Sequence, residues 1–190
     1  MAPAGHNGHM DSLRGQLLVA GPDLFDLNFR RTVVLIASHG EEGAMGVVLN
    51  RRSEHSVADA IPELMDLVDP GEHVCVGGPV QPSGVVVLAE FDDLAAAATT
   101  VMGDIGFVSA SADLGELAQV TRRARVFAGI SGWGAGQLDA ELERDDWIVE
   151  PARREDIFDT DPDDLWGEVL GRKGGRYALV ARMPFDPSVN

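Results

Sequence analysis

Residues 32–50 contain two apolar stretches separated by a short turn, and this pattern limits the folds that the chain can adopt. The first stretch, residues 32–38, is rich in β-branched residues and apolar on both faces, which predicts a strand covered from both sides. The second, residues 44–50, follows after five residues that include Gly40 and Gly43, which predicts a hairpin. Because strands joined by a tight hairpin run antiparallel, the pattern excludes an all-parallel sheet.

Strand-type and helix-type patterns alternate over the rest of the chain. Further strands are expected over residues 16–20, 73–76, 84–89, 107–109, 125–130, 147–150 and 177–182. Helices are expected over residues 57–67, 113–122, 137–144 and 161–170. We expect Pro62 to kink or divide the first helix, Ser111 to cap the second, and strands 73–76 and 84–89 to lie side by side. The pattern predicts an α+β fold with a mixed sheet.

Length and composition favour a single domain. With 190 residues, 45% of them hydrophobic, the chain can bury one substantial core, which we assign to residues 13–190 after a disordered tail at residues 1–12. The longest aliphatic stretches are far too short to cross a bilayer, and the N-terminal residues lack the features of a secretory signal. Cys75 is the only cysteine, so an intrachain disulfide is impossible, and we expect a cytoplasmic protein.

The net charge of the chain is strongly negative. The sequence has 31 acidic and 15 basic residues, a formal net charge of -16, which disfavours direct binding of nucleic acid. Most basic residues are arginines, several of them in adjacent pairs that form either surface ion pairs or a clamp for an anion. His55 and His73 have no carboxylate or histidine at ligand spacing, so we expect neither a metal ion nor a cofactor.

Residues 131–138 place three glycines at alternate positions around a tryptophan, which predicts a strand, a bend and then a helix. One interpretation is a packed structural bend in which Trp133 is a wedge or a pocket wall and Gln137 makes the main polar contact. A second is dinucleotide binding, although the third glycine falls one position early for that motif. A third is nucleophilic catalysis by Ser131, for which His39 is the candidate base.

Four segments that occur in one order carry a family pattern. They read Asn28-Phe29-x-Arg31-Thr32-Val33-Val34-Leu35; His39-x-x-x-Gly43-Ala44-Met45-Gly46-Val47-Val48-Leu49-Asn50-Arg51; Gly77-Gly78-Pro79-Val80; and Gly132-Trp133-Gly134-Ala135-Gly136-Gln137-Leu138-x-x-Glu141-Leu142. Over residues 15–170 the chain resembles the AlgH family, also called the YqgE family, of bacterial proteins of unassigned biochemical function. The family's name derives from a proposed role in regulating alginate production. The resemblance implies a single-domain α+β fold with a large, bifurcated mixed sheet surrounded by helices.

The leading functional hypothesis is a cytoplasmic binding or regulatory module that acts through a protein or small-molecule partner and does not itself bind DNA or a membrane. The sequence contains no recognisable catalytic constellation. The alternative is a hydrolase-type enzyme or a nucleotide-binding protein whose pocket is formed by His39, the turn at residues 77–78 and the bend at residues 132–136. The candidate ligand or partner pocket consists of His39, Asn50, Arg51, Gly77, Gly78, Pro79, Ser131, Trp133, Gly134, Gly136 and Gln137.

Overall fold

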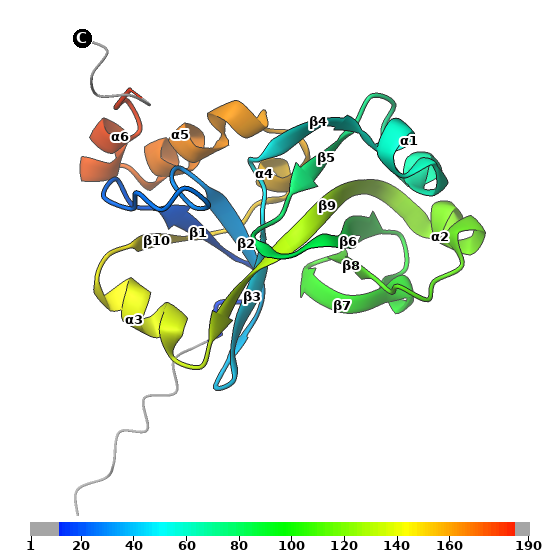
Figure 1. Ribbon diagram of the computed structural model, residues 1–190, viewed down its shortest axis with the longest axis horizontal. Helices are drawn as coiled ribbons and strands as arrows, with labels where there is room; N and C mark the ends of the chain where they lie inside the picture. The colour runs from blue at the N-terminus through cyan, green and yellow to red at the C-terminus, as the bar shows by residue number, and fades with distance from the viewer. Residues whose placement is uncertain (1–11, 185–190) are drawn as a thin grey trace, which may run out of the picture.

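The computed structural model describes residues 12–184, in which one long strand, β9 (Thr121–Gly134), is shared by two branches of a 10-stranded sheet (Figure 1). Along one edge, β9 pairs in antiparallel fashion with β6 (Val80–Phe91). Along the other edge it pairs in parallel with β5 (His73–Val76) and then, antiparallel, with β3 (Gly43–Val48). The sheet therefore forks along β9, which confirms the expected α+β fold with a mixed sheet.

Both branches continue away from β9 through shorter strands. The remaining strands are β2 (Val33–Gly40), β1 (Gln16–Ala20) and β10 (Trp147–Pro151) beyond β3, β8 (Ile105–Val108) and β7 (Ala97–Met102) beyond β6, and β4 (Arg52–Ser56) beside β5. Strands β2 and β3 form the expected hairpin, with His39 opposite Ala44. The β5–β9 pair is parallel, and the other described pairs are antiparallel.

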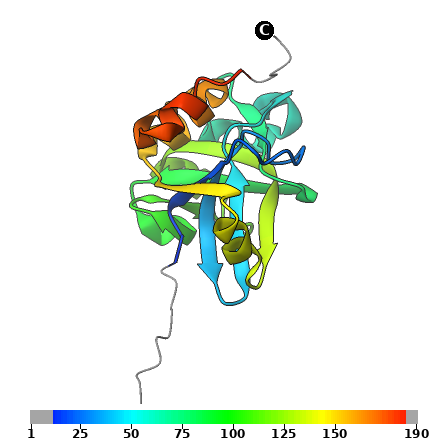
Figure 2. The same cartoon turned by 90° about the vertical axis from the view of Figure 1, so that its left-hand side faces the viewer.

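Short helices surround the sheet (Figure 1 and Figure 2). They are α1 (Val57–Ala60), η1 (Pro62–Leu67), η2 (Leu94–Ala96), α2 (Leu114–Val120), α3 (Gln137–Glu143), α4 (Arg154–Phe158), α5 (Pro162–Lys173) and α6 (Arg176–Val180), of which η1 and η2 are 3-10 helices. As expected, Pro62 divides the first helical region, because it begins η1 after α1 has ended. Helices α5 and α6 lie at the end that holds β1 and β10, and α1 and α2 lie at the opposite end.

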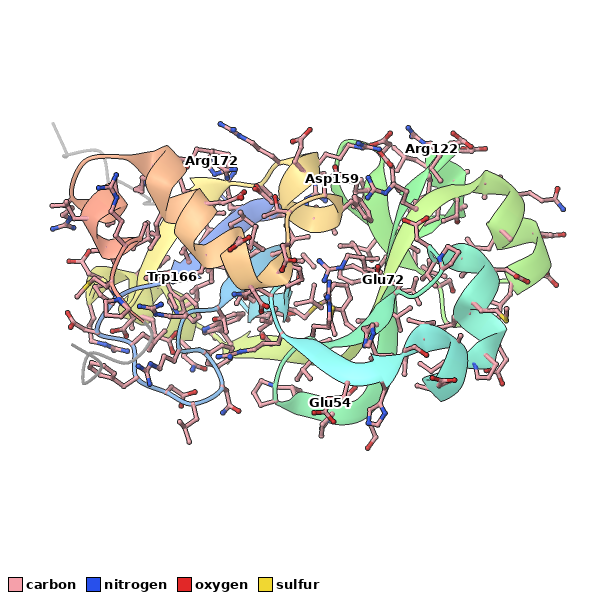
Figure 3. The ribbon with its side chains drawn as sticks, turned by 90° about the horizontal axis from the view of Figure 1, so that it is seen from above. Glu54, Glu72, Arg122, Asp159, Trp166 and Arg172 are labelled. Atoms are coloured by element: carbon pink, nitrogen blue, oxygen red, sulfur yellow. The ribbon has the colours of Figure 1, made fainter. Side chains whose placement is uncertain are left out.

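The core lies on both faces of the forked sheet. Helix α5 buries Leu165 and Trp166, and Trp166, labelled in Figure 3, donates from Nε1 to the Ala20 carbonyl of β1 at 3.0 Å. A separate cluster that includes Phe91 and Val126 holds α2 and η1 against the other branch. Because burial contributes about 25 cal/mol per Å² of apolar surface, these clusters keep the short helices on the sheet.

The expected strand over residues 177–182 is wrong, because the chain forms α6 there. Two successive glycines with positive φ follow α5 and turn the chain away from the sheet. The outer edge of β10, where a closing strand would pair, is already capped by side chains of α5. Lys173 Nζ donates to the Val149 carbonyl at 3.1 Å, and Arg172 donates to the Pro151 carbonyl at 3.2 Å.

The expected pairing of strands 73–76 and 84–89 is also wrong, because β9 lies between them. Phe127 of β9 pairs with Cys75 on one edge and with Val86 on the other. Local patterning predicts each of these strands but contains no information about which one is central. The order depends instead on contacts between residues far apart in the chain.

The start of the second helix differs from the expected one. Helix α2 is capped by Asp113, whose carboxylate accepts a hydrogen bond from the Glu116 N–H at 2.9 Å. The Ser111 hydroxyl instead bonds to that of Ser109 at 3.0 Å. Asp113 stands immediately before the first helical residue, which is the position from which a side chain reaches the free N–H groups. The expected disordered tail, residues 1–12, lies outside the described residues except for its last residue.

The link from β5 to β6 crosses the backbone of β9 from one edge to the other. The Gly77 N–H donates to the Ala128 carbonyl at 2.8 Å, and the chain then passes over β9 to pair with its opposite edge. A Cβ atom on Gly77 would lie 2.3 Å from the Gly129 oxygen, and one on Gly78 would lie 2.3 Å from the Ile130 oxygen. The crossing is therefore closer than any side chain permits, which explains the glycine pair.

We expect Gly77→Ala to destabilise the fold by about 3 kcal/mol or more, because the new methyl group overlaps a backbone oxygen of the central strand. Gly171→Ala is the matched control. Gly171 lies in α5 with no atom within 4 Å of its Cβ position, so alanine should stabilise that helix by about 0.5–1 kcal/mol. Denaturant unfolding followed by circular dichroism measures both changes, and equal stability of the two variants would contradict a close crossing.

Candidate functional site

Trp133, at the centre of the glycine-rich segment, fastens helix α3 to strand β9. The residue lies opposite Ala44 in the β3–β9 pair and is 6% exposed. Its Nε1 donates to a carboxylate oxygen of Glu141 at 2.9 Å, and Trp147 Nε1 donates to the same oxygen at 2.8 Å. Phe29 packs against both indoles, with ring centroids 6.1 Å and 5.5 Å away. One carboxylate thus joins α3 to two strands through charge-assisted hydrogen bonds.

Gln137 holds the connection between β9 and α3 in place. Its side-chain oxygen accepts a hydrogen bond from the Gly134 N–H at 3.0 Å, and its amide nitrogen donates to Glu141 at 3.0 Å. The expected bend beginning at Ser131 is wrong, because β9 continues through Gly134 in register with β3. The chain turns only at Gly136, which has a φ of 70° and caps α3. Trp133, Gly134, Gln137 and Glu141 therefore form hydrogen bonds mainly with one another and with Trp147.

Glu141 is the functional group that sequence reasoning missed in this segment. The residue belongs to the quoted motif, but it was not among the candidate site residues. Its part in the structure depends on Trp147, which reaches it from a different strand. The one available signal was its spacing from Gln137, since residues four apart on a helix lie on the same face.

Ser131 and His39 do not form a nucleophile and base. The Ser131 hydroxyl is fully buried and donates to the Gly77 carbonyl at 3.0 Å. His39 Nδ1 accepts a hydrogen bond from the Leu13 N–H at 3.3 Å, and Nε2 lies 3.3 Å from a carboxylate oxygen of Asp139. Because a backbone N–H can only donate, the neutral imidazole carries its proton on Nε2. Nδ1 is therefore occupied by a backbone N–H, and Nε2 faces a carboxylate of the same chain and not Ser131.

Asn50 and Arg51 hold the chain that leads into β2. The Asn50 side chain accepts a hydrogen bond from the Val33 N–H at 2.8 Å and donates to the Arg31 carbonyl at 2.9 Å. Arg51 donates to the Arg30 carbonyl at 2.6 Å, and burial lowers the pKa of its guanidinium. These bonds stabilise Arg31 at a φ of 54°, a left-handed conformation that non-glycine residues rarely adopt.

Three candidate residues meet at a surface recess of about 430 Å³, which we call the crossing recess because it lies beside the link from β5 to β6. Arg51, Gly78 and Pro79 line it, whereas His39, Ser131 and Trp133 do not. The side chains at its surface are Leu27, Asn28, Arg51, Arg52, Val76, Pro79 and Pro82. Leu27 is 88% exposed and Val76 is 46% exposed. The recess therefore combines two cations with exposed apolar side chains in an acidic chain.

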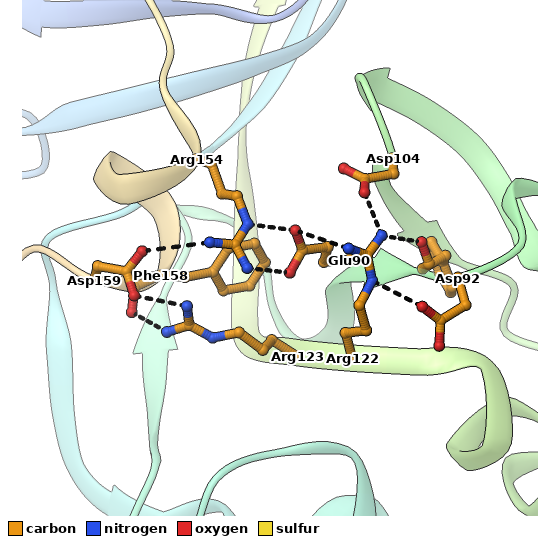
Figure 4. A network of polar contacts seen from close by, with 9 residues as sticks. Glu90, Asp92, Asp104, Arg122, Arg123, Arg154, Phe158 and Asp159 are labelled. Atoms are coloured by element: carbon orange, nitrogen blue, oxygen red, sulfur yellow. Dashed lines mark hydrogen bonds and ion pairs between the residues drawn. The ribbon is translucent and has the colours of Figure 1, made fainter.

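Three arginines from the adjacent pairs neutralise carboxylates on another side of the molecule (Figure 4). Glu90 is 1% exposed and forms ion pairs with Arg154 and Arg122. Hydrogen bonding to Glu90 raises the pKa of the Arg154 guanidinium. Arg123 bonds to Asp159 at 2.6 Å. Figure 3 shows Arg122 and Asp159 along one long side of the molecule, with Glu54 on the opposite side. This cluster is a closed ion-pair network, and such networks are structural more often than catalytic.

Among residues 12–184, no group of three or more His, Cys, Asp or Glu side chains is placed to hold a metal ion. None of the helices in that range has the length and apolar character needed to span a bilayer.

The fold and the site define a single-domain α+β protein in which most motif residues hold backbone segments together. A family model described as AlgH-like matches residues 17–178, and the chain belongs to the AlgH-like family. UPF0301 proteins of Mycolicibacterium smegmatis and Thermobifida fusca are 40% and 41% identical to it, covering 100% and 96% of this chain and 95% and 98% of theirs.

Solved structures carry the same fold. A protein of Corynebacterium diphtheriae superposes with a TM-score of 0.81 at 32% identity, covering 89% of this chain and 91% of that one. The AlgH protein from Pseudomonas aeruginosa superposes with a TM-score of 0.69 at 27% identity, covering 98% and 100%. The resemblance identified from the four motifs is confirmed.

We expect Glu141→Gln to destabilise the fold by about 1–3 kcal/mol, because two buried indole N–H groups lose a charged acceptor. Glu143→Gln is the matched control, since Glu143 is exposed on the same helix. Thermal unfolding measures the stability of both variants, and near-ultraviolet circular dichroism reports the packing of Trp133 and Trp147. An unchanged spectrum and melting temperature in Glu141→Gln would show that the carboxylate does not join these elements.

Proposed function

We propose that this protein is a binding module that docks an acidic, partly apolar segment of a partner protein in the crossing recess. The observation that carries the proposal is the composition of the recess. Arg51 and Arg52 are the charged residues among the described residues that line it, although the chain as a whole carries a net charge of -16. Exposed Leu27 and Val76 flank them, and contiguous apolar groups with a polar rim are typical of interaction sites.

The walls of the recess are held rigidly before any partner arrives. The Arg51 side chain is tied to the Arg30 carbonyl, and the link at Gly78 and Pro79 is fixed by its close crossing over β9. A preformed site loses less conformational entropy on binding than a flexible one, which increases affinity for a given contact area. Rigid walls therefore favour recognition of a short peptide segment.

The chemistry of the recess favours binding over a covalent step. Its polar side chains are Asn28, Arg51 and Arg52. A protonated guanidinium and a neutral amide do not act as general bases at neutral pH. Two arginines are also too few to overcome the repulsion between a strongly negative chain and the phosphates of a nucleic acid. Because Cys75 is a free, buried thiol, we include a cytoplasmic location in the proposal.

The test uses two pools of peptides of about ten residues, both rich in Leu, Val and Phe, one acidic and one basic. We expect the acidic pool to change the amide chemical shifts of residues that line the recess and the basic pool to leave them unchanged. Leu27→Asp should weaken binding about tenfold or more, because it places a negative charge at the mouth of the recess. Leu179→Asp is the matched control, since Leu179 is 69% exposed on α6.

Three results would contradict the proposal. One is the absence of shift changes at the recess with the acidic pool, and another is equal binding of both variants. The third is selective binding of a nucleoside triphosphate in the recess in place of peptide, which would favour the nucleotide-binding alternative.

A further inference from the structure

The charge of the chain is distributed unevenly along the sequence. Residues 53–121 contain no lysine or arginine, but they contain twelve aspartates and glutamates. This stretch forms the end of the molecule that holds α1, η1, α2, β7 and β8, together with most of β6 (Figure 1). Four of these acids pair with arginines from outside the stretch, Glu90, Asp92 and Asp104 with Arg122 and Glu72 with Arg125. The remaining acids leave this end with an acidic excess, which attracts partners of the opposite sign.

A groove of about 620 Å³ lies at this end, and we call it the end groove. Residues from η1, α2, β6, β7 and β8 line it, together with Met45 and Ile130 from the central strands. None of its lining residues is charged, although charged residues make up 24% of the chain. Uncharged lining of this kind is typical of the buried centre of a protein interface.

The groove has a buried floor and exposed walls. Leu64, Val87 and Phe107 are at most 8% exposed. Leu64 and Val87 belong to the core cluster beneath α2 and η1, and Phe107 belongs to the larger core cluster of the sheet. Val85 and Leu114 are 46% and 36% exposed and rise at the walls. A partner that covers these walls buries apolar surface without displacing a bound charge, so burial contributes directly to affinity.

Exposed acidic side chains lie on the two short helices that each contribute one residue to the groove, Leu64 of η1 and Leu114 of α2. Glu63 and Asp66 are exposed on η1 next to Leu64, and Asp113 and Glu116 are exposed at the start of α2. Neither these helices nor strands β6, β7 and β8 contain a lysine or an arginine. The apolar lining and the acidic residues on η1 and α2 therefore select an occupant with an apolar centre and positive flanks.

We propose that the end groove binds an amphipathic helix of a partner protein, with an apolar face seated in the groove and Lys or Arg side chains beside the acidic residues of η1 and α2. Uncharged apolar walls offer few partners for backbone N–H and C=O groups, and a helix satisfies its own. Addition of a strand at β7 is disfavoured, because register shifts interrupt that strand and Gly15 packs against the Val101 carbonyl.

A second copy of this chain does not have the required chemistry. Each copy carries a net charge of -16 and the same exposed acids on η1 and α2, so face-to-face packing of two end grooves would bring like charges together. The proposal is independent of the crossing recess, because that recess is lined by Arg51 and Arg52 and selects the opposite charge. Failure at either surface is therefore distinguishable from failure at the other.

The probe is a model helix of about 18 residues with Leu along one face and Lys on the other, titrated into the full chain at about 150 mM salt. Its comparators are a scrambled peptide of the same composition and a helix with Glu in place of Lys. We expect the scrambled peptide to bind about tenfold more weakly and the Glu helix not to bind. Amide shift changes should fall on residues that line the end groove.

Variants on the protein side separate the groove from general attraction to an acidic chain. Val85→Asp should weaken binding about tenfold or more, because it places a charge in the apolar centre. Glu63→Lys and Glu116→Lys lie at exposed positions and should each weaken binding about fivefold. Glu143→Lys on α3 is the matched control with the same change in net charge, and it should bind as the parent chain does.

The proposal is overturned by any of four results: equal affinity for the ordered and scrambled peptides, equal loss in Glu63→Lys and Glu143→Lys, shift changes centred away from the groove, or a dimer in light scattering that buries it. Amide spectra of the variants in the absence of peptide report whether each one folds. If Val85→Asp fails to fold, Glu63→Lys and Glu116→Lys still test the proposal.

Discussion

Contact between backbones at the crossing of β9 is the constraint on which the rest of the structure depends. The Gly77 carbonyl accepts hydrogen bonds from both the Val48 N–H and the Ser131 hydroxyl, so one oxygen joins the β3 branch, the crossing link and β9. Each such bond contributes about 1 kcal/mol net, but all three elements must approach within the space that Gly77, Gly78 and Gly129 leave open. The fork, the β5–β6 link and the crossing recess exist together because side chains are absent there.

Local patterns in the sequence predict most of the strands and helices, but they do not predict the order of the strands. The β2–β3 hairpin follows from residues near one another in the chain, and so does α3, where Leu138 is buried and Asp139 lies on a more open face. The central place of β9 does not, because it depends on pairing Phe127 with residues from two separate segments. The mistaken final strand has the same cause, since side chains of α5 reach the edge of β10 only in the folded chain.

The candidate site was predicted as one pocket, whereas the structure divides its residues among several tasks. Trp133 and Gln137 bond through Glu141, Asn50 supports the chain before β2, and Ser131 supports the crossing. Four motif segments in a fixed order indicate a family, but packing requirements and ligand contacts select such residues equally well. The end groove had a different signal, the absence of basic residues over 53–121, and Met45 is the one residue of the four quoted segments that lines it.

The two proposed surfaces differ in how charge acts at a distance. Arg122, Arg123 and Arg154 are engaged with carboxylates of their own chain, so they reduce the field near Glu90 and leave the exposed acids of η1 and α2 unopposed. A basic helix therefore meets attraction before contact, and its association should be fast and sensitive to salt. An acidic segment meets overall repulsion from a chain of net charge -16 and reaches Arg51 and Arg52 only at short range. Its affinity must then come from apolar contact with Leu27 and Val76, which persists in salt.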